Sequence, residues 1–341
     1  MIALLLLLAP QAADLDVALD AMAAVRPDNA AGYAAARDRV LAFGRDAIPA
    51  LQARGAADQW TAAGWVRALA AESCRLRLAD PGLAAAVDRP AGLDPAQYRQ
   101  FRLPEPICNA ELARRGSAAV PLLLERWRWT FAEHPFSAGD AGEKEREALR
   151  SAILQQGDAR ARHFLAEVLG TAGLPDSWRG QAAVSLGMAG GTGALPILTR
   201  TLDDRAQPVA VREACARGLG RVADPAALDA IRSRLGEADV RRSLLQALGL
   251  LGSAWGWDAR GAARAPTADL VRRGCADALM GALRQAPEES AAIGTALSMT
   301  AWPDSLGAVE ALASDATATA AQRAAAGAVL PGLKQSLARR T

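Results

Sequence analysis

The sequence predicts an all-α protein built as a solenoid of antiparallel helix pairs. The first observation is composition, because 51% of the 341 residues are hydrophobic but only 4% are aromatic. An apolar content that consists largely of Ala and Leu favours closely packed helices over β-structure. The second observation is a repeat in the C-terminal half, in which an Arg is followed seven residues later by Leu-Gly. Units of this kind cannot bury their apolar faces alone, so they stack into an array.

The repeat is clearest in three segments, Arg179–Gly187, Arg212–Gly220 and Arg241–Gly249, whose arginines recur at offsets of 33 and 29. Two further copies are degenerate. Ser290 replaces the Arg and Ser298 the Gly of one, and Pro331 replaces the Gly of the last, which begins at Arg323. We interpret the recurring arginines as a structural ladder that pairs with carboxylates of adjacent units. An Arg suits this role because it satisfies several acceptors from one position.

One unit of the array carries an insertion. Ser290 follows Arg241 at an offset of 49, so this unit is longer than the others by roughly 16 to 20 positions. We place the extra residues in the segment 253–267, and insertions of this kind map to loops on one face of a solenoid, often the binding face. Because Trp and Arg dominate binding hot spots, we predict that four residues of this segment contact a partner: Trp255, Trp257, Arg260 and Arg264.

The same pattern recurs more loosely upstream. In two places a Pro follows a Gly by five residues, Pro49 after Gly44 and Pro121 after Gly116. This spacing predicts a tight turn between helices, with the Pro at an early helical position.

Two irregular insertions interrupt the N-terminal half, at residues 81–107 and 134–142. The first contains five prolines, so it cannot be one continuous helix. No flexible linker long enough to divide the chain is present, and we therefore expect residues 14–341 to form a single solenoid.

A second candidate partner-binding cluster lies in the segment 125–131, where Trp127 and Trp129 alternate with arginines. Arg and Trp can contact a protein or stack on nucleic-acid bases. The alternative interpretation is that Trp127 and Phe131, which are four residues apart, both point into the core and leave the arginines in solvent.

The repeated motif is Arg-x-x-Ala-x-x-x-Leu-Gly, a turn, and then Ala-Leu-Pro-x-Leu as in Ala194–Leu198. It resembles HEAT repeats, particularly the short bacterial kind grouped with the phycobiliprotein-lyase-type HEAT-like repeats, over residues 179–337 and more weakly over 31–133. The resemblance implies a right-handed, armadillo-type superhelix whose concave surface binds proteins or peptides. We therefore predict a non-catalytic protein-binding or assembly scaffold. The alternatives are a ligand-handling protein similar to chromophore lyases and a cytoplasmic helical-repeat protein that binds nucleic acid.

Residues 1–13 predict an export signal. A short apolar run that ends at Leu8 is followed by small residues and then by Asp14, and the run is too short to span a bilayer. A cut near Ala12 or Ala13 would leave a mature chain with no transmembrane segment, in the periplasm or secreted. No Lys or Arg precedes the run, so the alternative is a docked terminal helix in a cytoplasmic protein.

The cysteines offer a second indication of an oxidising compartment. Cys74 and Cys108 bracket the insertion at 81–107, and a disulfide between them would enclose that whole insertion in a loop. Such a bridge would add about 3 to 4 kcal/mol by restricting the unfolded chain. The alternative is two buried free thiols, and we expect Cys215 and Cys275 to fill gaps between helices.

We find no catalytic or cofactor motif in the sequence, and we predict neither an enzyme nor a bound cofactor or metal. His163 and Glu167 share a helix face and could ligate a metal, but such a pair more often forms a hydrogen bond. The Gly-rich segment 187–193 is interpreted as a turn that ends a helix in the left-handed conformation. The formal net charge of +2 argues against a nucleic-acid partner, so we expect a protein or peptide partner.

Overall fold

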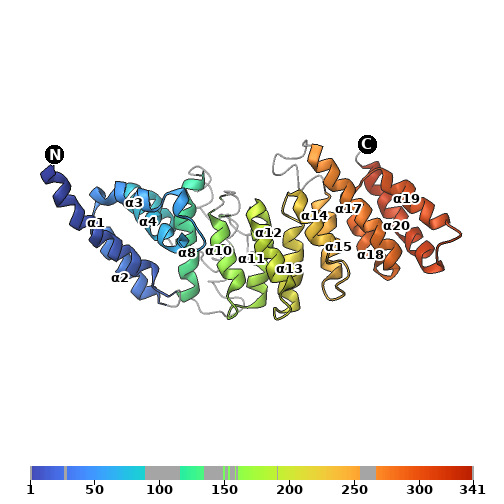
Figure 1. Cartoon of the computed structure of the whole chain (residues 1–341), viewed down its shortest axis with the longest axis horizontal. Coiled ribbons are helices and arrows are strands. Elements are labelled where there is room, and N and C mark those ends of the chain that lie inside the picture. Colours follow the sequence, from blue (N-terminus) through green and yellow to red (C-terminus); the bar gives the residue numbers. More distant parts are fainter. Residues whose placement is uncertain are drawn as a thin grey trace, which may run out of the picture. The chain divides into compact units, whose positions relative to one another are not determined.

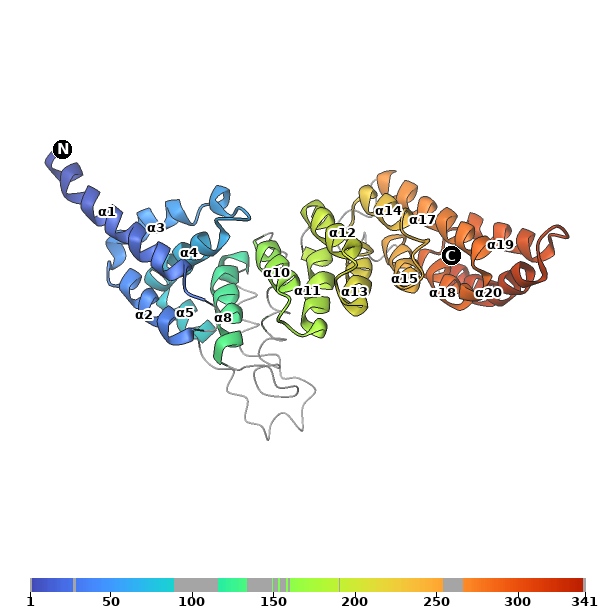
Figure 2. The same ribbon diagram turned by 60° about the horizontal axis from the view of Figure 1, so that its bottom comes forward.

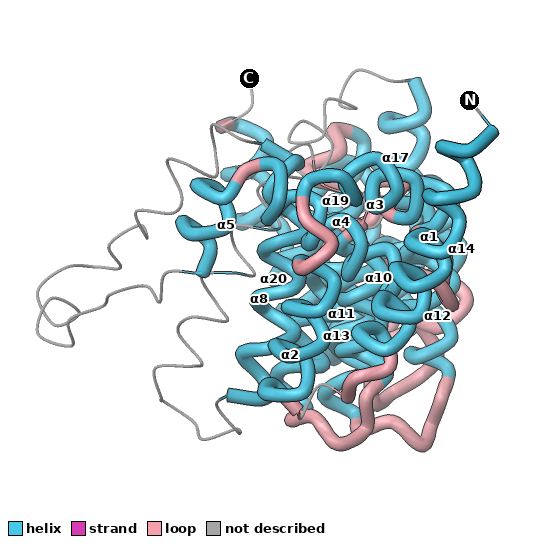
Figure 3. Tube along the Cα trace, turned by 90° about the vertical axis from the view of Figure 1, so that its left-hand side faces the viewer, coloured by secondary structure: helices cyan, strands magenta, loops and turns pink. Residues whose placement is uncertain are grey.

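The structure is a computed structural model that describes residues 2–26, 29–88, 116–133, 149, 153, 158, 160–189, 191–253 and 266–339. Within these ranges every regular element is a helix and no strand is present (Figure 3). The chain forms two compact units, residues 1–164 (unit 1) and residues 165–341 (unit 2). Helices pack against their neighbours in each unit, which confirms the predicted all-α solenoid class. The expectation of one continuous solenoid over residues 14–341 stays a prediction.

Unit 1 is organised around one central helix, α4, which packs against α1, α2, α3, α5 and α8. The described helices of this unit are α1 (Ile2–Ala23), α2 (Ala30–Leu41), α3 (Ile48–Arg54), α4 (Trp65–Ala79), α5 (Pro81–Asp88), α8 (Val120–Glu133) and the first part of α10 (Ala161–Gly170). Leu15, Leu19 and Met22 lie on one face of α1 and are fully buried against α2 and α4.

The C-terminal half of α1 is held by charge as well as by apolar contacts. Arg54 donates two hydrogen bonds to the Asp16 carboxylate, at 2.6 and 2.5 Å, and Arg67 donates a third. The hydrogen bond from Arg54, together with the charge of both arginines, lowers the pKa of Asp16 to about 2. Residues from Leu15 onward therefore belong to the folded unit. The helix also runs through the predicted cleavage site, and the export signal stays a prediction.

The turns of unit 1 follow the predicted spacing of Gly and Pro. Gly44 has a positive φ of 70°, and Pro49 lies in the first turn of α3. Pro121 likewise lies in the first turn of α8.

The insertion predicted at residues 81–107 is not irregular from its start, because residues 81–88 form α5. Pro81 stands at the first helical position, where its missing N–H is not needed. The Asp80 carboxylate accepts a hydrogen bond from the backbone N–H of Leu83 at 3.0 Å and so caps the helix. The rest of this segment, and the insertion predicted at 134–142, lie outside the described residues.

Unit 2 arranges its helices in two layers (Figures 1 and 2). The A layer contains α11 (Asp176–Ala189), α13 (Val209–Leu219), α15 (Arg241–Leu251), α18 (Ser290–Thr300) and α20 (Ala320–Ala338). The B layer contains α12 (Leu195–Asp203), α14 (Pro225–Arg232), α17 (Pro266–Gln285) and α19 (Asp304–Ser314). From α11 to α20 the described helices alternate between the two layers, as the helix-pair pattern predicts.

Neighbouring A-layer helices approach closely because small residues line their contacts. A Cβ added at Gly187 of α11 would lie 2.0 Å from the carbonyl oxygen of Gly218 in α13. The predicted turn at residues 187–193 is therefore wrong at its start, since Gly187 lies inside α11. The left-handed residue is Gly191, with a φ of 53°.

The extra residues of the insertion-bearing unit are only partly a loop. α17 begins at Pro266 and has 20 residues, whereas α12 has 9 and α14 has 8. The prediction that placed all of the extra residues in 253–267 is therefore wrong, because a longer B-layer helix takes up part of them. Residues 254–265 lie outside the described ranges.

Candidate functional site

Two of the recurring arginines of unit 2, Arg179 and Arg212, satisfy the ends of helices. They are 3% and 2% exposed. The Nε of Arg179 donates to the carbonyl of Leu169 at 2.9 Å, and the Nε of Arg212 donates to the carbonyl of Leu202 at 2.7 Å. Both carbonyls belong to the last turn of the preceding helix, where no partner within the helix is left. Each arginine thus joins its own helix to the one before it.

Arg212 also reaches forward to the next unit, as the ladder hypothesis predicts. Its guanidinium donates to Glu237 at 2.7 Å and to Asp239, both in the segment between α14 and α15. The hydrogen bond from Arg212 lowers the pKa of Asp239 below its ordinary value. One buried side chain therefore links α12, its own helix α13 and the segment that precedes α15.

The predicted pairing with carboxylates holds for only part of the ladder. Arg179 reaches forward to the side-chain amide of Gln207, and Arg323 donates to the backbone carbonyls of Asp315 and Ala318. A carbonyl or an amide oxygen accepts from a guanidinium as a carboxylate does, so the sequence pattern of the Arg does not reveal its acceptor. Because their donors are used within the protein, these arginines do not form a free basic row for a ligand.

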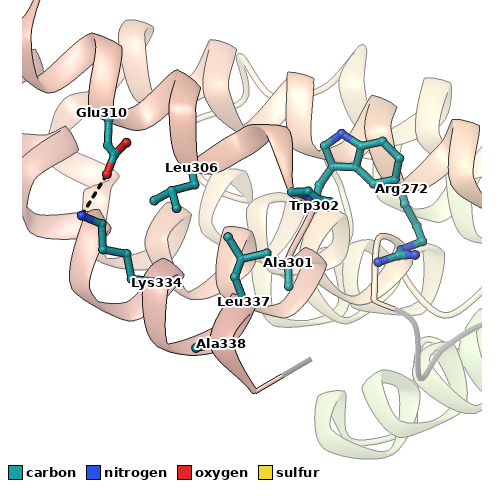
Figure 4. A pocket seen from close by; sticks show the side chains of 9 residues that line it. Arg272, Ala301, Trp302, Leu306, Glu310, Lys334, Leu337 and Ala338 are labelled. Atoms are coloured by element: carbon teal, nitrogen blue, oxygen red, sulfur yellow. Dashed lines mark ion pairs between the residues drawn. The ribbon is translucent and has the colours of Figure 1, made fainter. Parts of the chain in front are cut away.

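A groove of about 750 Å³ lies at the C-terminal end of unit 2 (Figure 4). We call it the C-terminal groove, and it is lined by Arg272, Ala301, Trp302, Pro303, Leu306, Glu310, Lys334, Leu337 and Ala338. Its middle is apolar. Lys334 donates to Glu310 at 2.8 Å at one end, and Arg272 and Trp302 lie at the other. A volume of this size falls in the range of known binding sites.

The groove exists because the last helix is longer than the repeat requires. With the offset of 33 between Ser290 and Arg323, the end of α18 at Thr300 corresponds to Leu333. The groove residues of α20 are Lys334, Leu337 and Ala338, which all lie beyond that point. The extra turn and a half of α20 thus forms one wall, and α19 contributes Leu306 and Glu310 to the groove.

Arg272 holds the other end of the groove together. Its guanidinium donates to the carbonyls of Gly252 at 3.3 Å and Thr300 at 3.4 Å, which follow α15 and end α18. It also lies 5.8 Å from the centre of the Trp302 ring, within the range of a cation–π contact. The Asp269 carboxylate lies 3.3 Å away, with a side chain that is 65% exposed.

The backbone between α18 and Trp302 is strained. Ala301 has a φ of 42° and a ψ of 51°, the left-handed conformation that costs a non-Gly residue about 1 to 2 kcal/mol. Strain of this kind persists where the surroundings determine it, and it is frequent at functional sites. Here the left-handed conformation of Ala301 ends α18 and turns the chain into the segment that carries Trp302.

The sequence analysis did not select Trp302 or Arg272. A signal was nevertheless present, because Trp302 stands at the same repeat position, counted from Ser290, as Gly191, Asp224 and Ser253 in the other units. A large aromatic side chain in a turn where the other copies have small or polar residues indicates a special surface.

The predicted partner-binding tryptophans of α8 are placed only in part. Trp127 is 3% exposed, and its ring centre lies 4.6 Å from that of Phe164, which in turn contacts Trp65. Its ring therefore packs in the interior of unit 1, as the alternative interpretation expects, and presents almost no surface to a partner. That interpretation is wrong for Arg128, which it placed in solvent: Arg128 is buried, and its guanidinium lies 5.9 Å from the centre of the Trp65 ring. The backbone of Trp129 lies in α8, but its side chain is outside the described part of the structure.

The remaining predicted residues, Trp255, Trp257, Arg260 and Arg264, lie outside the described residues, so their partner-binding role stays a prediction. The described segment before them ends at Ser253, one residue after Gly252, whose carbonyl accepts a hydrogen bond from Arg272 of the C-terminal groove.

Unit 1 contains a buried polar network that the sequence does not predict. Glu125 of α8 is 1% exposed and accepts hydrogen bonds from the Tyr33 hydroxyl at 2.5 Å and from Arg77 at 2.7 Å. Arg77 also pairs with Asp88 at the end of α5. A buried carboxylate of this kind is tolerated because two donors satisfy it, and the network fixes α2, α4, α5 and α8 to one another.

The described cysteines are buried thiols. Burial raises the pKa of Cys74, whose sulfur lies 3.8 Å from that of Met22, and burial raises the pKa of Cys215 and of Cys275 to about 12. Cys108 lies outside the described ranges, so the disulfide between Cys74 and Cys108 stays a prediction.

In the part of the chain that the structure describes, no group of three or more His, Cys, Asp or Glu side chains is gathered for an ion. Burial lowers the pKa of the His163 imidazole below 6.5. None of the described helices combines the length and apolarity needed to cross a membrane.

Comparison with protein families supports the fold assignment. A family model described as HEAT repeats matches residues 146–249, which include α10 to α14 and most of α15. This segment of the chain is therefore similar to HEAT repeats. No curated protein matches the chain.

Proposed function

We propose that the chain is a non-catalytic scaffold that binds a protein partner on unit 2, and that it acts after export from the cytoplasm. The match of residues 146–249 to HEAT repeats carries the first part of this proposal, because HEAT repeats commonly serve as protein-interaction scaffolds. Stacked helical repeats present extended surfaces to other proteins.

The distribution of charge and apolar surface agrees with a protein partner. The ladder arginines are used inside the protein, and the net charge of +2 offers no field for nucleic acid. The C-terminal groove instead combines an apolar middle with polar ends, the arrangement of a protein–protein interface.

Site-specific photo-crosslinking tests this function. A benzophenone amino acid replaces Leu306 in the groove in one version of the full chain and exposed Asp229 of α14 in another, each expressed at native level in its own cells. We expect a discrete cross-linked protein from at least one position on unit 2, identified by mass spectrometry. The same treatment at many exposed positions of both layers with no cross-linked protein would overturn the proposed function.

Export is tested separately by the intact mass of the cell-envelope fraction, with and without reductant. Loss of residues 1 to about 13 is the expected result, and an oxidised Cys74–Cys108 pair would support it further. An intact N-terminus in a soluble cytoplasmic fraction would contradict the export proposal without touching the scaffold proposal.

A further inference from the structure

We propose that the C-terminal groove binds a short segment of a partner protein in which an apolar side chain lies close to a carboxylate. The apolar side chain seats between Leu306 and Leu337, against Trp302, and the carboxylate pairs with Arg272. This inference rests on the proposed scaffold function and names what the partner must present.

The apolar side chain of the partner is inferred from the walls of the groove. Ala301, Pro303, Leu306 and Leu337 supply aliphatic surface from two helices and the turn before them, and Trp302 closes one end with an indole ring (Figure 4). A large apolar side chain that leaves water for this surface gains the usual hydrophobic free energy. Trp is also the residue most enriched among those that dominate binding.

We assign the carboxylate of the partner to Arg272 because Lys334 forms the shorter of the two ion pairs in the groove. Lys334 has Glu310 at 2.8 Å. Among the described residues, Arg272 binds carbonyls at 3.3 and 3.4 Å, the long end of the hydrogen-bond range, and the exposed Asp269 at 3.3 Å. Its side chain is 19% exposed, so a carboxylate that reaches it would be less screened than one at an open surface. The forked guanidinium suits a carboxylate in particular.

The charge pattern also selects against other anions. A nucleic-acid backbone or an anionic membrane needs several cations along its path. The described lining of this groove has two cations, and each lies near a carboxylate of the chain: Lys334 has Glu310 at 2.8 Å, and Arg272 has the exposed Asp269 at 3.3 Å. Two such cations are too few for a polyanion, whereas a peptide with a single carboxylate next to an apolar anchor needs Arg272 alone.

The test begins with a phage library of random dodecapeptides selected against the full chain. We expect the enriched sequences to share a large apolar residue near Asp or Glu. A synthetic peptide of the consensus is then titrated by fluorescence anisotropy. Leu337→Glu and Trp302→Ala should weaken its binding at least 10-fold, while Arg273→Gln, which changes an exposed neighbour outside the groove, should leave it unchanged. Circular dichroism of each variant checks that unit 2 is folded.

A double-mutant cycle isolates the charge pair. Replacing the acidic residue of the peptide by its amide should weaken binding to the wild-type chain about 5- to 10-fold and should have no effect on the Arg272→Gln variant. The inference is overturned by enriched peptides that bind the groove variants as well as the wild type, by an acid and an amide that bind equally, or by no enrichment over an unrelated protein. Because photo-crosslinking at Asp229 and at other exposed positions outside the groove tests partner binding independently, failure of the groove inference is distinguishable from failure of the scaffold function.

Discussion

Replacing Gly187 by Ala should destabilise unit 2, although Ala is the better helix former. The added Cβ would lie 2.0 Å from the carbonyl oxygen of Gly218, 2.7 Å from its carbonyl carbon and 2.9 Å from its Cα. To reach ordinary contact, α11 and α13 must separate by about 1.4 Å, since carbon and oxygen pack at about 3.4 Å. The neighbour is backbone, so no side-chain rotation relieves the clash.

The magnitude follows from two opposing effects. Overpacking of a well-packed interface costs about 1 to 3 kcal/mol and occasionally more, and the helix propensity of Ala returns up to about 1 kcal/mol. We expect a net loss of about 2 kcal/mol, or a Tm lower by roughly 4 to 8 °C for a unit of this size.

The assay is thermal and urea unfolding followed by circular dichroism, with Gly327→Ala as the matched control. Gly327 also lies within a helix, α20, but an added Cβ would have no atom within 4 Å. This variant should be stabilised by about 0.5 to 1 kcal/mol. If Gly187→Ala were as stable as the wild type while Gly327→Ala gained stability, close approach of the helices would not be the role of the repeated glycine.

Three further variants test the ladder, the clamp on α1 and the strained turn. Arg212→Met should cost about 3 kcal/mol in urea unfolding because it orphans the buried carbonyl of Leu202 and removes the buried cation that pairs with Glu237 and Asp239. Arg205→Met, which removes the other, 69% exposed partner of Glu237, should cost less than about 0.5 kcal/mol. Asp16 has a folded pKa of about 2 against 3.8, so its contribution to stability is present above pH 4 and is lost as the pH falls toward 2. Asp16→Asn should abolish that part of the pH dependence of Tm, and an unchanged profile would exclude the clamp. Ala301→Gly should raise the free energy of unfolding by about 1 kcal/mol, the strain that it relieves, and so raise Tm. A lower Tm would show that the left-handed turn is not strained.

Much of the fold follows from the sequence because each repeat specifies two helix contacts. The Leu-Gly pair sets the contact between A-layer helices, and the Arg that precedes it sets the contact with the preceding helix. What the pattern cannot reveal is the function of each residue within the contact. Gly187 looked like a turn residue because Gly commonly ends helices, whereas its role is to let a neighbouring backbone approach.

The candidate site was less predictable because it depends on where two helices end. Trp127 stood beside arginines and resembled a binding residue, yet Phe164, from a helix much further along the chain, covers its ring. Trp302 stood alone in the sequence, yet Arg272 lies 5.8 Å from its ring centre, and the last residues of α20 line the same groove. Pairwise contacts between segments so far apart leave no trace in local spacing, so exposure of a single Trp is decided by tertiary packing.

The position of the groove has a reason in the length of α20. Trp302 stands at the repeat position that Gly191 and Asp224 occupy in other units, where the residue is small or polar. The α20 residues that line the groove all lie beyond the point where α18 ends in the repeat. Trp302 and Arg272 lie at the opposite end of the groove from the ion pair of Lys334 and Glu310 (Figure 4). An aromatic side chain at a turn position that is otherwise small or polar, next to an Arg and an apolar groove, is the combination expected where a partner binds.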